Sequence, residues 1–175
     1  AEGARRNGAR NVNWVGGNPD PNLHTILAAL NECKTSIASV WNSNMYYSLE
    51  AAKLLFGTQD VYLSDFKWYD NNCALRYSKV PKYLEVVSRN HRLAFADAEL
   101  IIRHLVMPGH ISCCTEPILK WIVKNLGPMV TNVMSQYRPI YLADKYPEIN
   151  RRITSEEYEN ALNIAKEVGL QNLEP

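Results

Sequence analysis

Two kinds of hydrophobic segment alternate along this chain, and that alternation limits the folds open to it. Strand-like runs cover residues 11–15, 36–41, 60–63, 99–107 and 130–134. Between them, apolar residues recur at helical spacing over residues 23–30, 48–56, 81–96 and 114–126. Strands that alternate with helices imply right-handed crossovers and a parallel sheet. We therefore expect an α/β fold with five parallel strands, either a partial or full barrel or an open doubly wound sheet.

Capping signals support several of these helices. Ser48 precedes the helix over residues 48–56, with Ala51 placed in its first turn. Thr154 and Glu157 have the spacing of a capping box for a last helix over residues 154–168, which would end at Gly169. Residues 2–8 resemble the end of a helix that leads into the strand over residues 11–15. A helix in that place implies an earlier strand before it, so we expect the first strand of the complete sheet to be missing from this chain.

Length and composition favour one domain over residues 1–175. The 175 residues are 46% hydrophobic, enough for one sizeable core. The net charge is only +1, with 19 basic and 18 acidic residues, so we expect neither a nucleic acid nor a membrane surface as partner. We find no apolar run of about 20 residues. Four unevenly spaced cysteines fit a reducing compartment, which predicts a soluble cytoplasmic protein.

Polar residues follow the carboxyl ends of the strands, which is where parallel α/β folds place their chemistry. Gly16 and Gly17 would let the backbone approach a ligand before Pro19 ends the turn. A tight turn without a ligand is the alternative. The next strand is followed by residues 42–44, Asn-Ser-Asn.

Asp65, Lys67 and Arg103 are the charged residues of this set. Asp65 and Lys67 flank Phe66, so their side chains should point to the same side, either as a ligand site or as an ion pair at the rim. Arg103 stands inside an apolar strand and needs an anionic ligand or an internal carboxylate as partner.

A second candidate site is a metal centre in or after the fourth strand. His104, His110, Cys113 and Cys114 offer ligands suited to zinc. Adjacent cysteines fit one tetrahedral site poorly, however. Buried thiols next to a helix capped by Ser112 are the simpler interpretation.

Five motifs in this order carry a family resemblance: NVNWVGGNP (11–19), VWNSN (40–44), VYLSDFK (61–67), IRHLVMPG (102–109) and NVMSQYRP (132–139). Together they resemble the radical S-adenosylmethionine enzymes related to pyruvate formate-lyase activating enzyme. The resemblance implies a partial (β/α)6 TIM-like barrel. It also implies S-adenosylmethionine bound beside a [4Fe-4S] cluster and cleaved reductively to a 5′-deoxyadenosyl radical.

The resemblance also implies a role for each site residue. Backbone atoms of Gly16 and Gly17 would contact the methionyl amino group, Lys67 would hold its carboxylate, and Asp65 would orient Lys67 or help to bind a cation. Arg103 would lie near the carboxylate or the ribose. Gln136 and Arg138 would reach the adenosine. The asparagines Asn18, Asn42 and Asn44 belong to the same site. Asn18 stands where relatives carry an acidic residue, and Asn42 stands where they often carry aspartate, which weakens the cation role.

One departure from the family pattern has a large consequence. Such enzymes hold the cluster with Cys-x3-Cys-x2-Cys, because three thiolates leave one iron open to the cofactor. The four cysteines, Cys33, Cys73, Cys113 and Cys114, cannot supply that spacing. We therefore expect the cluster ligands to lie in a full-length protein and this fragment alone to be inactive.

The resemblance also implies partners: an electron donor, and a glycyl-radical enzyme or another protein substrate. The alternative function is a degenerate barrel that binds a nucleoside or a protein without turnover.

Overall fold

The computed structural model describes residues 2–15 and 18–172. The chain forms two compact units, Ala1–Ser64 with Val86–Ile101, and Asp65–Glu85 with Ile102–Pro175. Each is described separately below. The expectation of a single domain stays a prediction.

The first unit contains three parallel strands in the order β1-β2-β3: β1 (Asn11–Trp14), β2 (Ala38–Ser43) and β3 (Val61–Asp65), whose last residue belongs to the second unit. Asn11 pairs with Ala38 in β1 and β2, and Val40 pairs with Val61 in β2 and β3. The helices are α1 (Glu2–Arg6), α2 (Leu23–Glu32), α3 (Leu49–Leu55) and most of α5 (Tyr83–Asp97), with a short 3-10 turn η1 (Asp20–Asn22) before α2.

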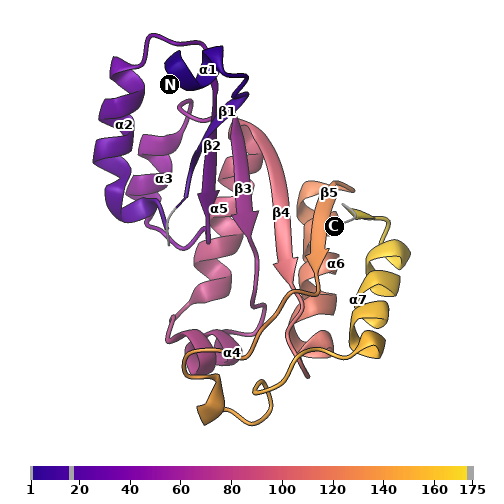
Figure 1. Ribbon diagram of the computed structural model, residues 1–175. Helices are drawn as coiled ribbons and strands as arrows, with labels where there is room; N and C mark the ends of the chain where they lie inside the picture. Colours follow the sequence, from indigo (N-terminus) through magenta and orange to yellow (C-terminus); the bar gives the residue numbers. More distant parts are fainter. Residues whose placement is uncertain (1, 16–17, 173–175) are drawn as a thin grey trace. The chain divides into compact units, whose positions relative to one another are not determined.

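The second unit contains most of β4 (Glu99–Leu105), β5 (Val130–Met134) and β6 (Gln171–Asn172), again parallel and in sequence order. The arrows of β4 and β5 point the same way in Figure 1, as do those of β2 and β3. Its helical segments are α4 (Asn71–Cys73), two π-helical turns η2 (Ala74–Ser78) and η3 (Ile111–Thr115), α6 (Glu116–Leu126), a 3-10 turn η4 (Ala143–Lys145) and α7 (Ser155–Glu167). Helix α7 packs against α6 and β5.

The predicted α/β fold with parallel strands is confirmed. Two capping predictions are also confirmed: Ser48 Oγ accepts a hydrogen bond from the Ala51 amide at 3.2 Å, and Thr154 and Glu157 form a capping box. Several expected boundaries were wrong by one or two residues. Strand β2 ends at Ser43 rather than residue 41, and α5 starts at Tyr83 rather than Pro81. The two-residue strand β6 was not predicted, because so short a segment has no periodic pattern.

Each unit has its own apolar core. In the second unit, Ile118, Leu119 and Ile122 occupy one face of α6 and are fully buried, as is Phe66 at the end of β3. Burial of one such side chain contributes roughly 1.5–3 kcal/mol. The ring of Phe66 packs edge-on against Trp121 with centroids 5.4 Å apart. In the first unit the largest fully buried side chain is Trp41. Within residues 2–15 and 18–172, every helix is too short or too polar to cross a bilayer.

Candidate functional site

The end of β3 presents a charged group that we call the ionic site: Asp65, Lys67 and Arg103. The carboxylate of Asp65 accepts from Lys67 Nζ at 2.7 Å through one oxygen and pairs with Arg103 Nη2 at 2.8 Å through the other. Lys67 is 37% exposed, Arg103 24% and Asp65 17%. One carboxylate is thus shared by two cations, which leaves the group with a net positive charge. The arrangement favours an anionic ligand at the rim.

Strand alternation explains why these side chains share a face. Phe66 enters the core, so its neighbours Asp65 and Lys67 point to the opposite side. In β4, Ile102 is buried and Arg103 points away from the core. The Phe66 amide donates to the carbonyl of Arg103 at 2.9 Å, which holds the two strand ends in register.

A cavity of about 550 Å³ opens at the ionic site. Apolar side chains of Leu105, Met134 and Ile140 line one part of it, and polar groups from the segment after β5 line another. Those polar residues are Gln136, Tyr137 and Arg138. Five predicted site residues therefore face one cavity, and a ligand with an anionic end and a flat apolar portion would match its lining.

His104 lies beneath the ionic site and is buried. Its Nδ1 lies 2.7 Å from the Phe66 carbonyl and its Nε2 lies 2.9 Å from Thr115 Oγ1. Burial lowers the pKa of His104 to about 4. The ring is therefore neutral at pH 7, with the proton on Nδ1 because a carbonyl can only accept. Both nitrogens are occupied, so His104 is not available as a ligand in the metal centre that was the alternative interpretation of this segment.

The predicted residues of the first unit form a hydrogen-bonded network of their own. Asn18 Oδ1 accepts from Ser43 Oγ and from the Asn44 amide, both at 3.3 Å. Asn18 Nδ2 donates to Asp20, and Ser43 Oγ lies 3.0 Å from Asp20 Oδ1. Burial raises the pKa of Asp20 to about 6, against the lowering effect of its hydrogen bond with Ser43. The network joins the segment after β1 to the end of β2.

The other predicted residues of this unit are Asn42, Gly16 and Gly17, and Asn44 makes one further contact. Asn42 lies in β2 itself and is half-buried, while Asn44 Oδ1 accepts from the Tyr46 amide at 2.9 Å. Gly16 and Gly17 lie outside the described residues, so their proposed contact with a ligand stays a prediction. Asp20 was missed by the sequence analysis. The side-chain oxygens of Asp20 and Ser43 meet around Asn18 only when the chain is folded, so no sequence pattern reveals the group.

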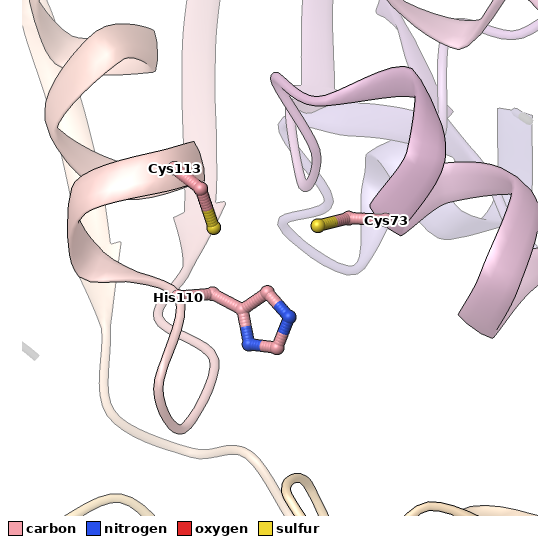
Figure 2. Close-up of side chains that lie close together, drawn as sticks. All are labelled: Cys73, His110 and Cys113. Carbon is pink, nitrogen blue, oxygen red and sulfur yellow. The ribbon is translucent and has the colours of Figure 1, made fainter.

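A third cluster, which we call the thiol–imidazole site, consists of Cys73, His110 and Cys113. One ligand atom from each lies within 4.8 Å of the others. Figure 2 shows the sulfur atoms of Cys73 and Cys113 pointing toward each other, with the His110 ring beside them. Two of the four metal ligands expected from the sequence therefore come together. Cys73 was missed, because it is 37 residues from His110 in the chain and no motif connects them.

Cys114 is buried next to this cluster but has a different environment. Burial raises the pKa of its thiol to about 11, although backbone N–H groups of Asp70 and Tyr69 donate to the sulfur and oppose that rise. Burial likewise raises the pKa of Cys73, and the neighbouring thiols of Cys114 and Cys113 add to the effect. Both thiols are therefore protonated at neutral pH. The expected cap by Ser112 is wrong, since His110 precedes η3 and Thr115 precedes α6.

The fold resembles a solved structure. It matches a crystallised domain of a pyruvate-formate lyase-activating enzyme from Bacteroides vulgatus with a TM-score of 0.74, over 95% of this chain and 98% of that chain. The two sequences are 18% identical, so this likeness establishes the fold: parallel strands and helices of a partial TIM-like barrel. No family model matches the chain.

A relative is found at much higher sequence identity. An uncharacterized protein of Methanocaldococcus jannaschii is 52% identical over 166 residues, which are 95% of this chain and 49% of that protein. The chain thus spans about half the length of this curated relative.

Proposed function

We propose that this chain forms the S-adenosylmethionine-binding part of a radical enzyme similar to pyruvate formate-lyase activating enzyme. The observation that carries the proposal is the ionic site in its cavity. Lys67 and Arg103 hold one carboxylate, Asp65, and retain a positive charge that can bind the methionyl carboxylate of the cofactor. The fold of the Bacteroides vulgatus domain supports the same conclusion.

The lining of the cavity fits the rest of this ligand. Met134 and Leu105 offer an apolar wall for the adenine ring, and Gln136 can donate to and accept from its polar edge. Arg138 adds a second positive charge at the rim. In this arrangement Lys67 binds and orients the amino-acid end, while the segment after β5 binds the nucleoside end.

The residues of this chain do not fit an iron–sulfur cluster of the family type. Three thiolates in a Cys-x3-Cys-x2-Cys spacing do not occur in the sequence, and the described Cys73 and Cys113 share their site with a histidine. The cluster, its electron donor and the redox step would depend on residues outside these 175. A glycyl-radical enzyme as protein substrate belongs to the same proposal, because that is the kind of enzyme for which the structural neighbour is named.

Calorimetric titration of two nucleosides tests the role of Lys67. S-adenosylmethionine carries the carboxylate, and 5′-methylthioadenosine lacks it. Lys67→Ala should weaken binding of the first by about tenfold or more, since a charged hydrogen bond contributes about 1.5–3 kcal/mol. Binding of the second should be unchanged.

Lys124→Ala is the matched control, because Lys124 is exposed on α6 and does not line this cavity. Equal affinity of S-adenosylmethionine for the wild type and Lys67→Ala would refute the proposed role. Equal loss of both nucleosides in Lys67→Ala would indicate a folding defect rather than a lost carboxylate contact, and circular dichroism of the variant would then decide between these outcomes.

A second candidate function is a barrel that binds a nucleoside or a protein without catalysis. The spacing of the four cysteines favours this function, because they do not form the Cys-x3-Cys-x2-Cys motif that holds an iron–sulfur cluster. Expression of the longer protein and measurement of iron, acid-labile sulfide and cofactor cleavage separates the two. A longer protein that binds S-adenosylmethionine but holds no cluster would support the binding-only function.

A further inference from the structure

We infer that Cys73, His110 and Cys113 form a binding site for a single zinc ion. The proposal concerns the thiol–imidazole site only and does not depend on the function of the ionic site. Two thiols and one imidazole meet at one point, with Cys73 at the end of α4 and His110 and Cys113 around η3, and such a donor set suits zinc in proteins.

The distances suit a metal after a small adjustment. The three ligand atoms lie within 4.8 Å of one another. Zinc bonded at about 2.3 Å to sulfur and about 2.1 Å to nitrogen, in tetrahedral geometry, separates its ligands by about 3.6 Å. The sulfurs of Cys73 and Cys113 already point toward each other, so both face the same space. Binding would draw the three atoms together by up to about 1.2 Å.

The tautomer of His110 is already the one that a metal requires. Its Nδ1 lies 2.6 Å from the carbonyl of Pro108, and a carbonyl can only accept, so Nδ1 carries the proton. Nε2 is then left with its lone pair for a metal. A backbone carbonyl that fixes the second nitrogen of a ligating histidine is a usual feature of zinc sites.

Aromatic contacts fix the orientation of the same ring. The rings of Trp68 and Tyr77 meet the His110 imidazole edge-on, with centroids 5.4 and 5.1 Å away. His110 is buried, whereas Cys73 and Cys113 are half-exposed. The site therefore has a rigid, dry side at the imidazole and an open side at the sulfurs, through which an ion can enter.

Local backbone geometry places both cysteines. Cys73 ends α4, which is capped by the Asp70 side chain at 2.7 Å from the Asn72 amide. Cys113 lies in the π-helical turn η3 that leads into α6. Three protein ligands leave the fourth zinc position to water or to a substrate atom.

The experiment loads the protein with metal under reducing conditions. The full chain is purified without a histidine tag, treated with a chelator, and titrated with Zn²⁺ and with Co²⁺ in the presence of a phosphine reductant. We expect one ion per chain, with the sulfur-to-cobalt charge-transfer absorption of a tetrahedral thiolate site. Cys73→Ala and Cys113→Ala should each lose that absorption and weaken Zn²⁺ binding by more than the roughly 10- to 100-fold that follows loss of an outer partner.

Matched controls separate ligands from other residues of the same type. Cys33→Ala removes a cysteine of the first unit, and His24→Gln removes an exposed histidine on α2; both should bind Zn²⁺ as the wild type does. His110→Gln should lose binding. Far-ultraviolet circular dichroism of each variant tests whether it is folded. If Cys113→Ala is not folded, Cys113→Ser replaces it.

Several results would overturn the inference. Binding that survives in folded Cys73→Ala and Cys113→Ala would place the ion elsewhere. A disulfide between Cys73 and Cys113 in the protein as isolated, found by thiol titration and peptide mass analysis, together with no Zn²⁺ binding after reduction, would assign the pair to redox chemistry. Iron with acid-labile sulfide that disappears in these two variants would show that a cluster, rather than zinc, occupies the site.

Discussion

The ionic site and the thiol–imidazole site lie in the same unit, yet they are assembled in opposite ways. The ionic site is built at strand ends, where alternation along β3 and β4 aims Asp65, Lys67 and Arg103 at one cavity. The thiol–imidazole site is built from turns: Cys73 ends a short helix, and His110 and Cys113 lie around a π-helical turn. The first could be predicted from a pattern, and the second could not.

This contrast shows what each site can tolerate. A strand-end site inherits its geometry from the hydrogen bonds of the sheet, so single changes should alter charge without moving the backbone. A site made from turns depends on how well those turns are held. His104 connects the two, because one ring nitrogen meets the Phe66 carbonyl between Asp65 and Lys67 and the other meets Thr115 at the end of η3.

The largest predicted effect comes from titrating His104. Its folded-state pKa is about 4 because of burial, below the ordinary 6.5, so the unfolded chain binds more protons between these values. The contribution of His104 to the free energy of unfolding is therefore full above pH 6.5 and falls by roughly 3 kcal/mol as the pH drops to 4. Urea denaturation at several pH values measures it. His104→Gln should flatten this dependence, and exposed His24→Gln should leave it as in the wild type; equal slopes in both variants would contradict the prediction.

Zinc should stabilise the turns and leave the strand-end site alone. At a free concentration about 100-fold above its dissociation constant, a ligand of the folded state raises the free energy of unfolding by about 2.7 kcal/mol. Thermal unfolding with and without Zn²⁺ should show this gain in the wild type and in Lys67→Ala. The gain should vanish in Cys73→Ala. If Lys67→Ala also lost it, the two sites would not be independent.

Asp65→Asn tests whether the ionic site is a structural ion pair or a ligand site. Removing the carboxylate leaves Lys67 and Arg103 close together without their shared anion, which should lower stability by about 1–2 kcal/mol. The same change frees both cations for an external carboxylate, so binding of acetate or methionine, followed by NMR, should strengthen. Asp144→Asn, at an exposed position, is the control. A loss of stability without any gain in carboxylate binding would favour a purely structural pair.

The smallest effect is expected from Asp20 in the first unit. Its pKa is raised to about 6 by burial, so the folded state binds its proton more readily than the unfolded chain does between pH 6 and 4. Its contribution to stability therefore rises as the pH falls through this range, opposite in sign to that of His104. The pKa shift corresponds to about 3 kcal/mol at most, but Asp20 is only half-buried, and an asparagine cannot accept from both Asn18 and Ser43 as the carboxylate does. Asp20→Asn should therefore raise stability at pH 7 by less than about 1 kcal/mol. Chemical denaturation at pH 7 and pH 5 checks the sign; a lower stability of the variant at pH 7 would contradict it.

The sequence predicted much of the fold because periodicity is a local property. Apolar spacing located α2, α3, α5 and α6, and capping signals located α7; the caps Ser48 and Thr154 were predicted correctly. The boundaries of β2 and α5 were missed by two residues. The spacing of apolar residues does not indicate where a strand stops pairing with its neighbour, or at which residue after a proline the helix begins.

The candidate site residues also fall into those that local sequence patterns predicted and those that they did not. That Arg103 would need an anionic ligand or an internal carboxylate followed from its place in an apolar strand, and the carboxylate of Asp65 pairs with it. That Asp65 and Lys67 share a side followed from alternation alone. The metal centre that was an alternative interpretation of one chain segment had partly wrong candidates: His104 uses both ring nitrogens for hydrogen bonds, and Cys73 rather than His104 lies beside His110 and Cys113.

By itself, then, the sequence determined the class of fold and the strand-end residues that face one cavity, because hydrophobic period and side-chain alternation act over a few neighbouring residues. Only the tertiary structure decided which cysteine meets His110 and which nitrogen of that ring is left for a ligand. Those choices depend on contacts between turns that lie far apart in the chain, and such contacts leave no periodic trace in the order of the amino acids.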